Sequence, residues 1–480
     1  MKEKKGSPSD AADRIIAEYR EKNLYLRDAV QLICELTASE DPQTAGAGLT
    51  ALFPGLVERL NDSFDPRSCR LYDLIFAQVI DFYRRLAAGA ELDRGLRDFG
   101  LLSEADLLDR KSRIRLTPFP DRADARRVKK ALLLSRVTIG ADVAVTGVAL
   151  AKLRRTLPEA EFVLIGSRKL RELFGGDERV RVRQLGYERG GGLLSRLTSW
   201  LEVAAIVEDE TRNLGPEEFW VIDPDSRLTQ LGLLPLLKDE RHYFFFESRG
   251  FQPRNPTTDP AAKLLGRLTS HWIGEVTGDP EPVYPFIALP RELREFGRMV
   301  GSKLREARTE RIVTVSFGVG GNQRKRLPDS FEESLVERLL TDSTLILDKG
   351  ASDDERNQVD RLIRKVRDRG KTIIELNERN AAAMEREPLA ADLVTWDGGI
   401  GIFSALTAAG DRYLGYDSAG QHIAAALGVP TLTVFVNSNS GTFAERWRPY
   451  GPGPIETVTL DPEHLPDQNR LLAEILERLR

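Results

Sequence analysis

The sequence predicts an α/β protein with two lobes, each built on a parallel sheet covered by helices, and an all-helical N-terminal region in front of them. From about residue 131 onward, short apolar runs of strand length alternate with helical or loop segments, which is typical of parallel sheets. Residues 9–110 lack this alternation, and their apolar residues recur at helical spacing. At 480 residues the chain is also too long for one ordinary core, so two or three domains are expected.

The N-terminal region begins with residues 1–8, which we expect to be a disordered tail, and continues as a helical extension over residues 9–110. Within the extension, Asp65 and Pro66 form an N-cap and first-turn pair. The residues after this pair place apolar side chains on one helical face: Leu71, Leu74, Ile75, Val79, Phe82 and Leu86. We favour packing of this region on the lobes. A dimer interface and a site that receives the acceptor are the alternatives.

Residues 111–130 are rich in Arg and Lys, and Pro118 and Pro120 prevent a continuous helix there. We interpret this stretch as a basic linker that leads into the first strand of the lobes. Peripheral contact with the anionic inner face of a membrane is the alternative to a solvated connector, which we favour.

The first lobe is expected over residues 131–290 and the second over residues 291–480. The expected strands of the first lobe are 131–135, 161–165, 218–222 and 242–246. Those of the second lobe are 311–316, 343–348, 371–375, 412–416 and 431–436. The segment 250–290 is rich in Pro and Gly and is interpreted as the hinge. The pattern is that of two Rossmann-like lobes that face a cleft.

Composition excludes several classes of protein. The 70 basic and 74 acidic side chains give a net charge of −4, which argues against nucleic-acid binding. No apolar run approaches the roughly 20 residues of a membrane span, and the N-terminus has no apolar core of a signal peptide. Cys34 and Cys69 have no metal-ligand spacing. We therefore expect a cytoplasmic protein.

The most informative stretch is residues 412–436, RYLGYDSAGQHIAAALGVPTLTVFV, which predicts a strand, a polar turn, a helix and a second strand. Asp417 and Ser418 are N-cap residue types before the apolar run Ile423–Leu427. The start of a helix carries free N–H groups and a partial positive charge, so it suits a phosphate. Ser418 and His422 add a hydroxyl and an imidazole N–H on the same turn. The pattern indicates a diphosphate pocket for a nucleotide-sugar.

The order Asp-Ser-x-x-x-His, Ala-rich helix and Gly-x-Pro resembles the family 9 glycosyltransferases, the bacterial heptosyltransferases of lipopolysaccharide biosynthesis. Segments 135–166, 316–328, 347–362 and 443–452 agree with the family in order and spacing, so the resemblance covers about residues 130–480. It implies GT-B architecture and a nucleotide-sugar donor, with ADP-heptose the best guess. It also implies that the closing helix Leu471–Leu479 crosses back onto the first lobe. Because a helix start and cations can neutralise the phosphates, we expect no metal cofactor.

The resemblance makes Asp142 the catalytic base. Transfer of a sugar with inversion needs one carboxylate to take the proton of the acceptor hydroxyl. Asp142 lies in a loop between a strand and a helix expected to start near Val145. The sequence departs from the family at Ala141, which separates Gly140 from the Asp, and at Val148, where Pro is usual. From the residues alone, a helix cap is the competing interpretation of Asp142.

Two loops of the second lobe complete the expected donor site. The resemblance assigns Lys325 to the donor diphosphate. The residues agree, since the glycines before Lys325 let the backbone approach a ligand and the lysine can neutralise a phosphate. The resemblance assigns an acidic residue after Gly350 to the ribose, where Asp354 and Glu355 both qualify. Each cluster is also consistent with a solvated turn or an acidic helix start. The full set of expected donor-binding residues is Lys325, Asp354, Glu355, Asp417, Ser418, Ala419, Gly420 and His422.

Asp223 and Asp225 match an Asp-x-Asp metal pattern. We favour another role for the segment that begins at Asp223, which is to cap an expected helix with the sequence LTQLGLLPLL.

The residues and the resemblance together predict an inverting glycosyltransferase that moves a sugar, heptose as the resemblance implies, to a hydroxyl of a glycan, a lipid-linked sugar or a protein. A catalytically inactive GT-B homologue that binds a nucleotide-sugar or a partner protein is the first alternative. An enzyme that hydrolyses or isomerises a nucleotide-sugar is the second. Because the expected pocket lies within 316–436, a chain that begins near residue 126 should retain nucleotide binding, with lower solubility if the extension packs on the lobes.

Overall fold

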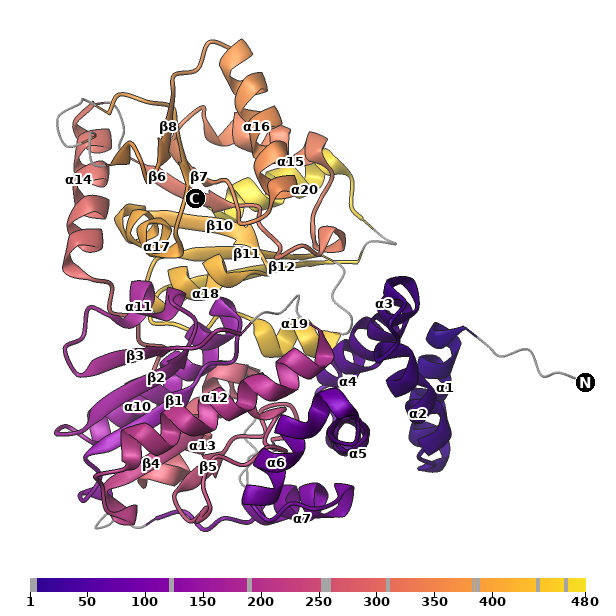
Figure 1. The fold of residues 1–480 in the computed structure, drawn as a ribbon. Coiled ribbons are helices and arrows are strands. Elements are labelled where there is room, and N and C mark those ends of the chain that lie inside the picture. Colours follow the sequence, from indigo (N-terminus) through magenta and orange to yellow (C-terminus); the bar gives the residue numbers. More distant parts are fainter. Residues whose placement is uncertain are drawn as a thin grey trace, which may run out of the picture.

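The computed structural model describes residues 7–120, 125–187, 192–251, 260–307, 311–381, 384, 389–436, 441–461 and 465–480. Along the chain, a helical extension is followed by two α/β lobes (Figure 1). The α/β class, the two parallel sheets and the helical N-terminal region are confirmed.

The extension consists of helices only, within the described residues. They are α1 (Pro8–Lys22), α2 (Arg27–Thr37), α3 (Pro42–Thr50), the π-helical η1 (Ala51–Glu58), α4 (Arg59–Asn61), α5 (Pro66–Arg84), η2 (Ala87–Gly89), α6 (Ala90–Asp98) and α7 (Glu104–Arg115). Helix α1 begins at Pro8, and Ser7 caps it by accepting a hydrogen bond from the Asp10 N–H, so residues 7 and 8 do not belong to a loose tail. The other residues of the expected tail, 1–6, lie outside the described ranges. Asp65 caps α5 by accepting from the Ser68 N–H at 3.1 Å, with Pro66 as its first residue.

The expected linker 111–130 differs from the structure at its start. Residues 111–115 are the last turns of α7, and Lys111 is 1% exposed, so this part is not a solvated connector. Its burial is possible because acidic partners surround it. The expected linker residues 121–124 lie outside the described part of the chain.

The sheet of the first lobe is fully parallel, with strand order β3-β2-β1-β4-β5. Its strands are β1 (Lys130–Leu134), β2 (Glu161–Gly166), β3 (Val180–Gln184), β4 (Phe219–Asp223) and β5 (Tyr243–Phe245). Its helical elements are α9 (Ile139–Ala141), the π-helical η3 (Asp142–Thr146), α10 (Gly147–Thr156), α11 (Lys169–Phe174), α12 (Leu193–Thr211), η4 (Pro216–Glu218), η5 (Arg227–Thr229), η6 (Pro260–Lys263) and α13 (Leu265–Thr277). Strand β3 was not predicted, because its sequence VRVRQ alternates as an edge strand does.

The extension and the first lobe share one hydrophobic core. Ile33 of α2, Val79 of α5 and Leu107 of α7 belong to the same cluster of buried side chains as Trp200 of α12 and Leu134 of β1. Helix α12 lies between the sheet and the extension in Figure 1, and α6 contacts α12 directly. The other face of the sheet is covered by α10 and α13. The apolar face at 71–86 is therefore buried in this shared core, where α5 packs mainly on the other extension helices α2, α4, α6 and α7.

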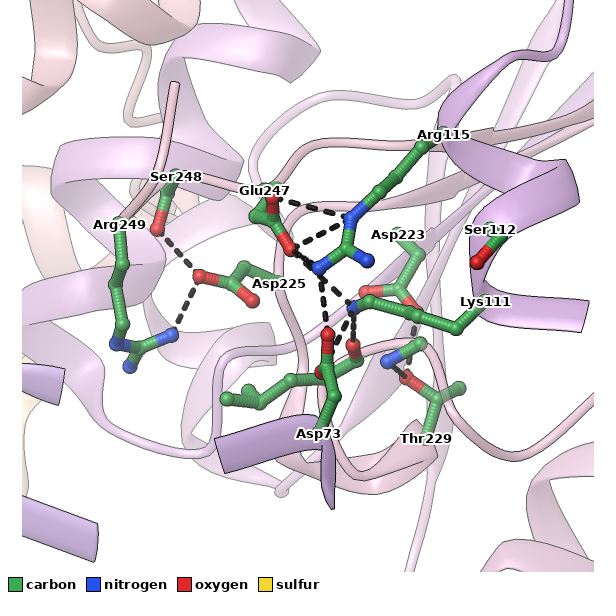
Figure 2. Close-up of polar contacts among 12 residues, drawn as sticks. Asp73, Lys111, Ser112, Arg115, Asp223, Asp225, Thr229, Glu247, Ser248 and Arg249 are labelled. Atoms are coloured by element: carbon green, nitrogen blue, oxygen red, sulfur yellow. Dashed lines mark hydrogen bonds and ion pairs between the residues drawn. The ribbon is translucent and has the colours of Figure 1, made fainter. Parts of the chain in front are cut away.

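A buried ionic network also joins the extension to the first lobe (Figure 2). Arg115 of α7 donates to Asp73 of α5 at 2.6 Å and to Glu247, which follows β5. The Lys111 ammonium lies 3.8 Å from both carboxylates and donates to the Leu231 carbonyl. These charges are compensated only while the extension stays in place.

Asp73→Ala is expected to lower the free energy of unfolding by about 3–5 kcal/mol, because it leaves buried cations without their counter-charge. The matched control is Asp13→Ala, whose partner is Arg59 and whose side chain is 63% exposed. An exposed pair of this kind contributes about 0–1 kcal/mol. Urea unfolding of both variants checks the difference, and equal effects would contradict the structural role of the network.

The second lobe has a seven-stranded parallel sheet with order β12-β11-β10-β6-β7-β9-β8. Its strands are β6 (Ile312–Ser316), β7 (Thr344–Asp348), β8 (Ile373–Asn377), β9 (Leu393–Asp397), β10 (Arg412–Tyr416), β11 (Thr431–Val436) and β12 (Ile455–Leu460). Its helices are α14 (Arg291–Ala307), η7 (Gln323–Lys325), α15 (Asp329–Leu339), α16 (Asp353–Asp368), α17 (Ile400–Ala409), α18 (Ala419–Ala426), α19 (Gly441–Trp447) and α20 (Gln468–Arg478). Strands β9 and β12 were not predicted.

The closing helix does not return to the first lobe. Leu471 and Ile475 of α20 are buried in the core of the second lobe with residues of β6 and α15. Arg412 fixes its end by donating to the Leu479 carbonyl at 3.2 Å. The expectation that this helix crosses over, which the family resemblance implied, is therefore wrong.

The expected hinge 250–290 is partly helical, since α13 lies within it and packs on α10. The residues after α13 run along the first lobe, where the Ala288 N–H donates to the Leu173 carbonyl at 2.9 Å. The lobes meet where α9 contacts α18 and α11 contacts α17. Two Rossmann-like lobes facing each other in this way form the GT-B architecture.

Candidate functional site

The segment 412–427 has the predicted form: strand β10, a polar turn and helix α18. Ser418 occupies the N-cap position with an extended backbone, but its side chain makes no capping hydrogen bond. The N–H groups of the first turn of α18 therefore have no side-chain cap from Ser418, and they retain the partial positive charge of a helix start.

Lys325 lies at this helix start. It is the last residue of η7, in the loop after β6, and its ammonium donates to Asp417 Oδ2 at 2.5 Å. Its Nζ also lies 5.0 Å from the centre of the Phe443 ring in α19. The Lys325 side chain is 23% exposed, so a ligand can reach it. The structure thus brings together the expected residues of two separate loops.

His422 is buried at the same turn. Its Nε2 lies 3.3 Å from the side-chain Nε2 of Gln421, and its ring packs edge-on against Trp447 at 5.9 Å between ring centres. Burial lowers the pKa of His422 to about 4, so the imidazole is neutral at pH 7. It can offer an N–H to a ligand but not a positive charge.

Ala419 and Gly420 have packing roles. A Cβ atom at Gly140 of the first lobe would lie 3.3 Å from Ala419 Cα, so the backbones of α9 and α18 nearly touch. A Cβ atom at Gly420 would lie 2.2 Å from the Tyr413 hydroxyl. Glycine at 420 is therefore required by Tyr413.

Asp142 does not occupy a loop before a helix that starts near Val145. Helical structure begins at Ile139, and Asp142 is the first residue of the π-helical turn η3. It does not cap this helix, because its hydrogen-bond donors are the Ser135 hydroxyl at 2.8 Å, the Arg136 N–H at 2.7 Å and the Thr146 hydroxyl at 3.2 Å. Asp142 is 1% exposed, and burial raises its pKa to about 6.

The backbone beside Asp142 is strained. Val137 has a φ of 73°, a conformation that β-branched residues rarely adopt. The π-helical turn follows within the same connection. Both features cost free energy, and both recur at functional sites.

The Asp142 loop and the α18 turn are adjacent across the lobe boundary. The guanidinium of Arg136, whose N–H binds Asp142, lies 5.8 Å from the Trp447 ring centre. Trp447 in turn packs on His422. A Cβ at Gly140 would lie 3.3 Å from His422 Cδ2. The candidate base and the candidate phosphate site thus belong to one region.

The two candidates for the ribose differ in their surroundings. Glu355 accepts hydrogen bonds from the N–H groups of Val319 at 2.8 Å, Ala351 at 2.9 Å and Ser352 at 3.1 Å. Burial alone would raise the pKa of Glu355, but these hydrogen bonds hold it below its usual value. Asp354 is exposed. Glu355 therefore ties the loop after β6 to the start of α16, while Asp354 is accessible.

The segment after β4 caps only the short 3₁₀ helix η5, where the Ser226 hydroxyl accepts from the Leu228 N–H at 3.1 Å. Only η5 and turns follow, and the expected helix LTQLGLLPLL does not form, since Gln230 and Leu231 have positive φ values of 49° and 54°. Asp223 instead holds the turn, accepting from Thr229 and Tyr243 at 2.5 Å each. Asp225 is paired with Arg249 at 2.5 Å (Figure 2). The two carboxylates serve separate local contacts.

Sequence reasoning missed Glu332, which supports the Lys325 loop. Glu332 pairs with Arg326, and it accepts from the Tyr416 hydroxyl at 2.8 Å. That hydroxyl accepts from the Leu327 N–H at 3.1 Å. Tyr416 directly precedes Asp417, so this network explains why Lys325 meets Asp417. No sequence signal marks Glu332, because its role depends on contacts between three elements.

No protein-family model and no curated protein sequence matches the chain. Solved structures are similar to it. Escherichia coli heptosyltransferase WaaC with ADP has 14% identity and a TM-score of 0.48, over 73% of this chain and 99% of that one. A glycosyl transferase of family 9 from Veillonella parvula has 14% identity and a TM-score of 0.45, over 73% and 90%. Escherichia coli ADP-heptose lipopolysaccharide heptosyltransferase II has 13% identity and a TM-score of 0.44, over 73% and 98%.

In the part of the chain that the structure describes, no helix combines the length and the apolar character needed to cross a membrane.

Proposed function

We propose that the protein is an inverting glycosyltransferase that moves a sugar, heptose in the first instance, from an ADP-linked donor to an acceptor hydroxyl. One observation carries the proposal. Lys325 and the uncapped start of α18 lie together beside the loop that holds Asp142. A cation and a helix start suit a diphosphate, and an adjacent carboxylate with a raised pKa suits proton removal.

The reaction needs two kinds of assistance. The bond between the sugar C1 and the donor phosphate breaks, and the diphosphate leaves with increased negative charge. Lys325 and the N–H groups of α18 can oppose this charge. Binding of the diphosphate to Lys325 competes with Asp417, which pairs with the Lys325 ammonium in the ligand-free protein.

The acceptor hydroxyl forms the new bond to C1 and gives its proton to Asp142. Asp142 Oδ2 accepts only from Ser135 among the described residues, and a carboxylate oxygen has two lone pairs, so a second donor can be accommodated. The pKa of about 6 leaves the carboxylate ionised at neutral pH and basic enough to accept a proton. For the ribose we propose Asp354, since the oxygens of Glu355 already bind backbone N–H groups.

Lys325→Ala and His422→Ala are expected to weaken ADP binding while the fold is retained. Each variant loses a hydrogen bond to a charged group, which contributes about 1.5–3 kcal/mol. Arg324→Ala is the matched control, because Arg324 is an exposed cation of the same loop. Isothermal titration calorimetry with ADP measures the affinities. An affinity unchanged in both site variants would exclude the proposed pocket.

The burial of Asp142 favours one second candidate, a homologue that binds a nucleotide-sugar or a partner without transfer. The same calorimetry combined with a transfer assay separates the two. Donor binding without turnover on any hydroxyl acceptor supports the inactive homologue. Release of free sugar without an acceptor indicates a hydrolase.

A further inference from the structure

Gln421, which is 0% exposed, connects two of the proposed site residues. Its side-chain Nε2 donates to Asp417 Oδ1 at 2.8 Å and lies 3.3 Å from His422 Nε2. Gln421 Oε1 is buried and has no hydrogen-bond partner among the described residues. The polar interactions of the side chain are therefore made by its amino group.

The orientation of the Gln421 amide follows from chemistry. If its oxygen and nitrogen were exchanged, Oε1 would face a carboxylate oxygen of Asp417, and two acceptors would be in contact. The NH₂ group has two hydrogens, one for Asp417 and one for His422. His422 Nε2 must then be the acceptor.

The charge state of His422 fits this assignment. The charged groups near its ring are Asp417 and Lys325, which pair with each other and have opposite effects on its protonation. Burial is the dominant influence and keeps the ring neutral. A neutral imidazole carries one hydrogen, and with Nε2 accepting, that hydrogen is on Nδ1.

We propose that Gln421 is a positioning residue, which fixes His422 in the tautomer with hydrogen on Nδ1 and holds Asp417 beside Lys325. As far as it concerns the ligand, this inference rests on the proposed function. The hydrogen-bond donor that His422 offers to a diphosphate is then Nδ1–H, and it is set before the ligand arrives. A donor fixed in advance loses less free energy on binding than one that must reorient.

The direct test is the tautomer of His422 in the full-length, nucleotide-free protein. Long-range ¹H–¹⁵N correlation spectra of protein with ¹⁵N-labelled histidine distinguish a protonated from a bare ring nitrogen. The chain has only 4 His, and His422→Gln assigns the signal by its loss. We expect a bare Nε2 and a protonated Nδ1. A protonated Nε2, or averaging between the two tautomers, would overturn the proposal.

Two variants extend the test. In Gln421→Glu the carboxylate can only accept, so the proton should move to His422 Nε2; an unchanged spectrum in the folded variant would argue against control by Gln421. Gln421→Met keeps the size but removes the donor, and ADP affinity should fall about tenfold. Gln31→Met in the extension, where Gln31 donates to Glu35, is the control and should leave both readouts unchanged.

The experiments distinguish failure of the proposed function from failure of the role proposed for Gln421. If the wild-type protein does not bind ADP, the proposed function fails, while the tautomer measurement still decides the role of Gln421. If ADP binds and Gln421→Met binds it equally well, Gln421 does not position the site. Should Gln421→Glu not fold, the tautomer seen in the wild-type spectrum is sufficient to support or overturn the proposal.

Discussion

A chain that begins at residue 126 is expected to form aggregates rather than a folded protein. The sequence alone predicts a shortened chain that keeps nucleotide binding, but the structure shows that the extension completes the core of the first lobe. Removal of α6 and α7 uncovers Trp200, Tyr243 and Phe245, on which Gly95, Arg110 and Lys111 lie. Exposure of each large apolar side chain costs about 1.5–3 kcal/mol, and the whole stability of a domain is about 5–15 kcal/mol.

Size-exclusion chromatography and thermal unfolding of the shortened chain provide the measurement. A chain that begins at Ser7 is the control, because it keeps the cap of α1 and every described element, and it should behave as the full-length protein does. A monomeric chain from residue 126 with a cooperative transition would show that the first lobe folds independently. ADP titration of that monomer would then test whether the second lobe alone supplies the nucleotide site.

Most of the strands predicted from sequence contain a continuous apolar run. Strands β1, β2, β6 and β7 lie inside sheets with both faces covered, and most of their residues are apolar. Strands β3 and β12 lie at sheet edges and alternate with polar residues, which makes them resemble loops. Strand β9, by contrast, has the apolar residues Leu393, Val394 and Trp396, so composition does not explain its omission.

The residues of the candidate site were predicted individually, but their mutual support was not. The α18 turn is readable from local pattern, because N-cap residues precede an apolar helical run. The contact of Lys325 with Asp417 depends on Glu332 and Tyr416, and the orientation of His422 depends on Gln421. These contacts join different elements of the fold, so a single sequence does not predict them. The π-helical turn at Asp142 likewise has no signal in residue spacing.

Burial of charge is the other feature that the sequence could not supply. Lys111 belongs to a run of basic residues that is typical of a solvated surface. Its burial depends on Asp73 and Glu247, which come from other elements. Asp142 is likewise buried. It was expected in an accessible loop, but its side chain is only 1% exposed.

Asp142→Asn is expected to reduce turnover by about 10²–10⁴-fold with donor affinity almost unchanged. The amide retains the shape of the side chain. Its oxygen can accept from the Arg136 N–H and the Thr146 hydroxyl, and its NH₂ can donate to the Ser135 hydroxyl, so the fold should persist. Thr146→Val is the matched control: it removes one hydrogen bond to Asp142, keeps the base, and should cost tenfold or less, about 0.5–1.5 kcal/mol.

The dependence on pH makes this test specific to proton transfer. Because burial raises the pKa of Asp142 to about 6, turnover of the wild-type protein should fall as the pH decreases through about 6, where the carboxyl becomes protonated and cannot accept a proton. Stability changes in the opposite direction. Between the folded pKa of about 6 and the ordinary value of 3.8, the folded state binds more protons than the unfolded state, so Asp142 adds stability as the pH falls through this window. The Asn variant should lack both effects. If the wild-type protein transfers sugar and the Asn variant does so at the same rate with the same pH profile, the base lies elsewhere, and Asp142 serves only to hold the strained loop that begins at Ser135.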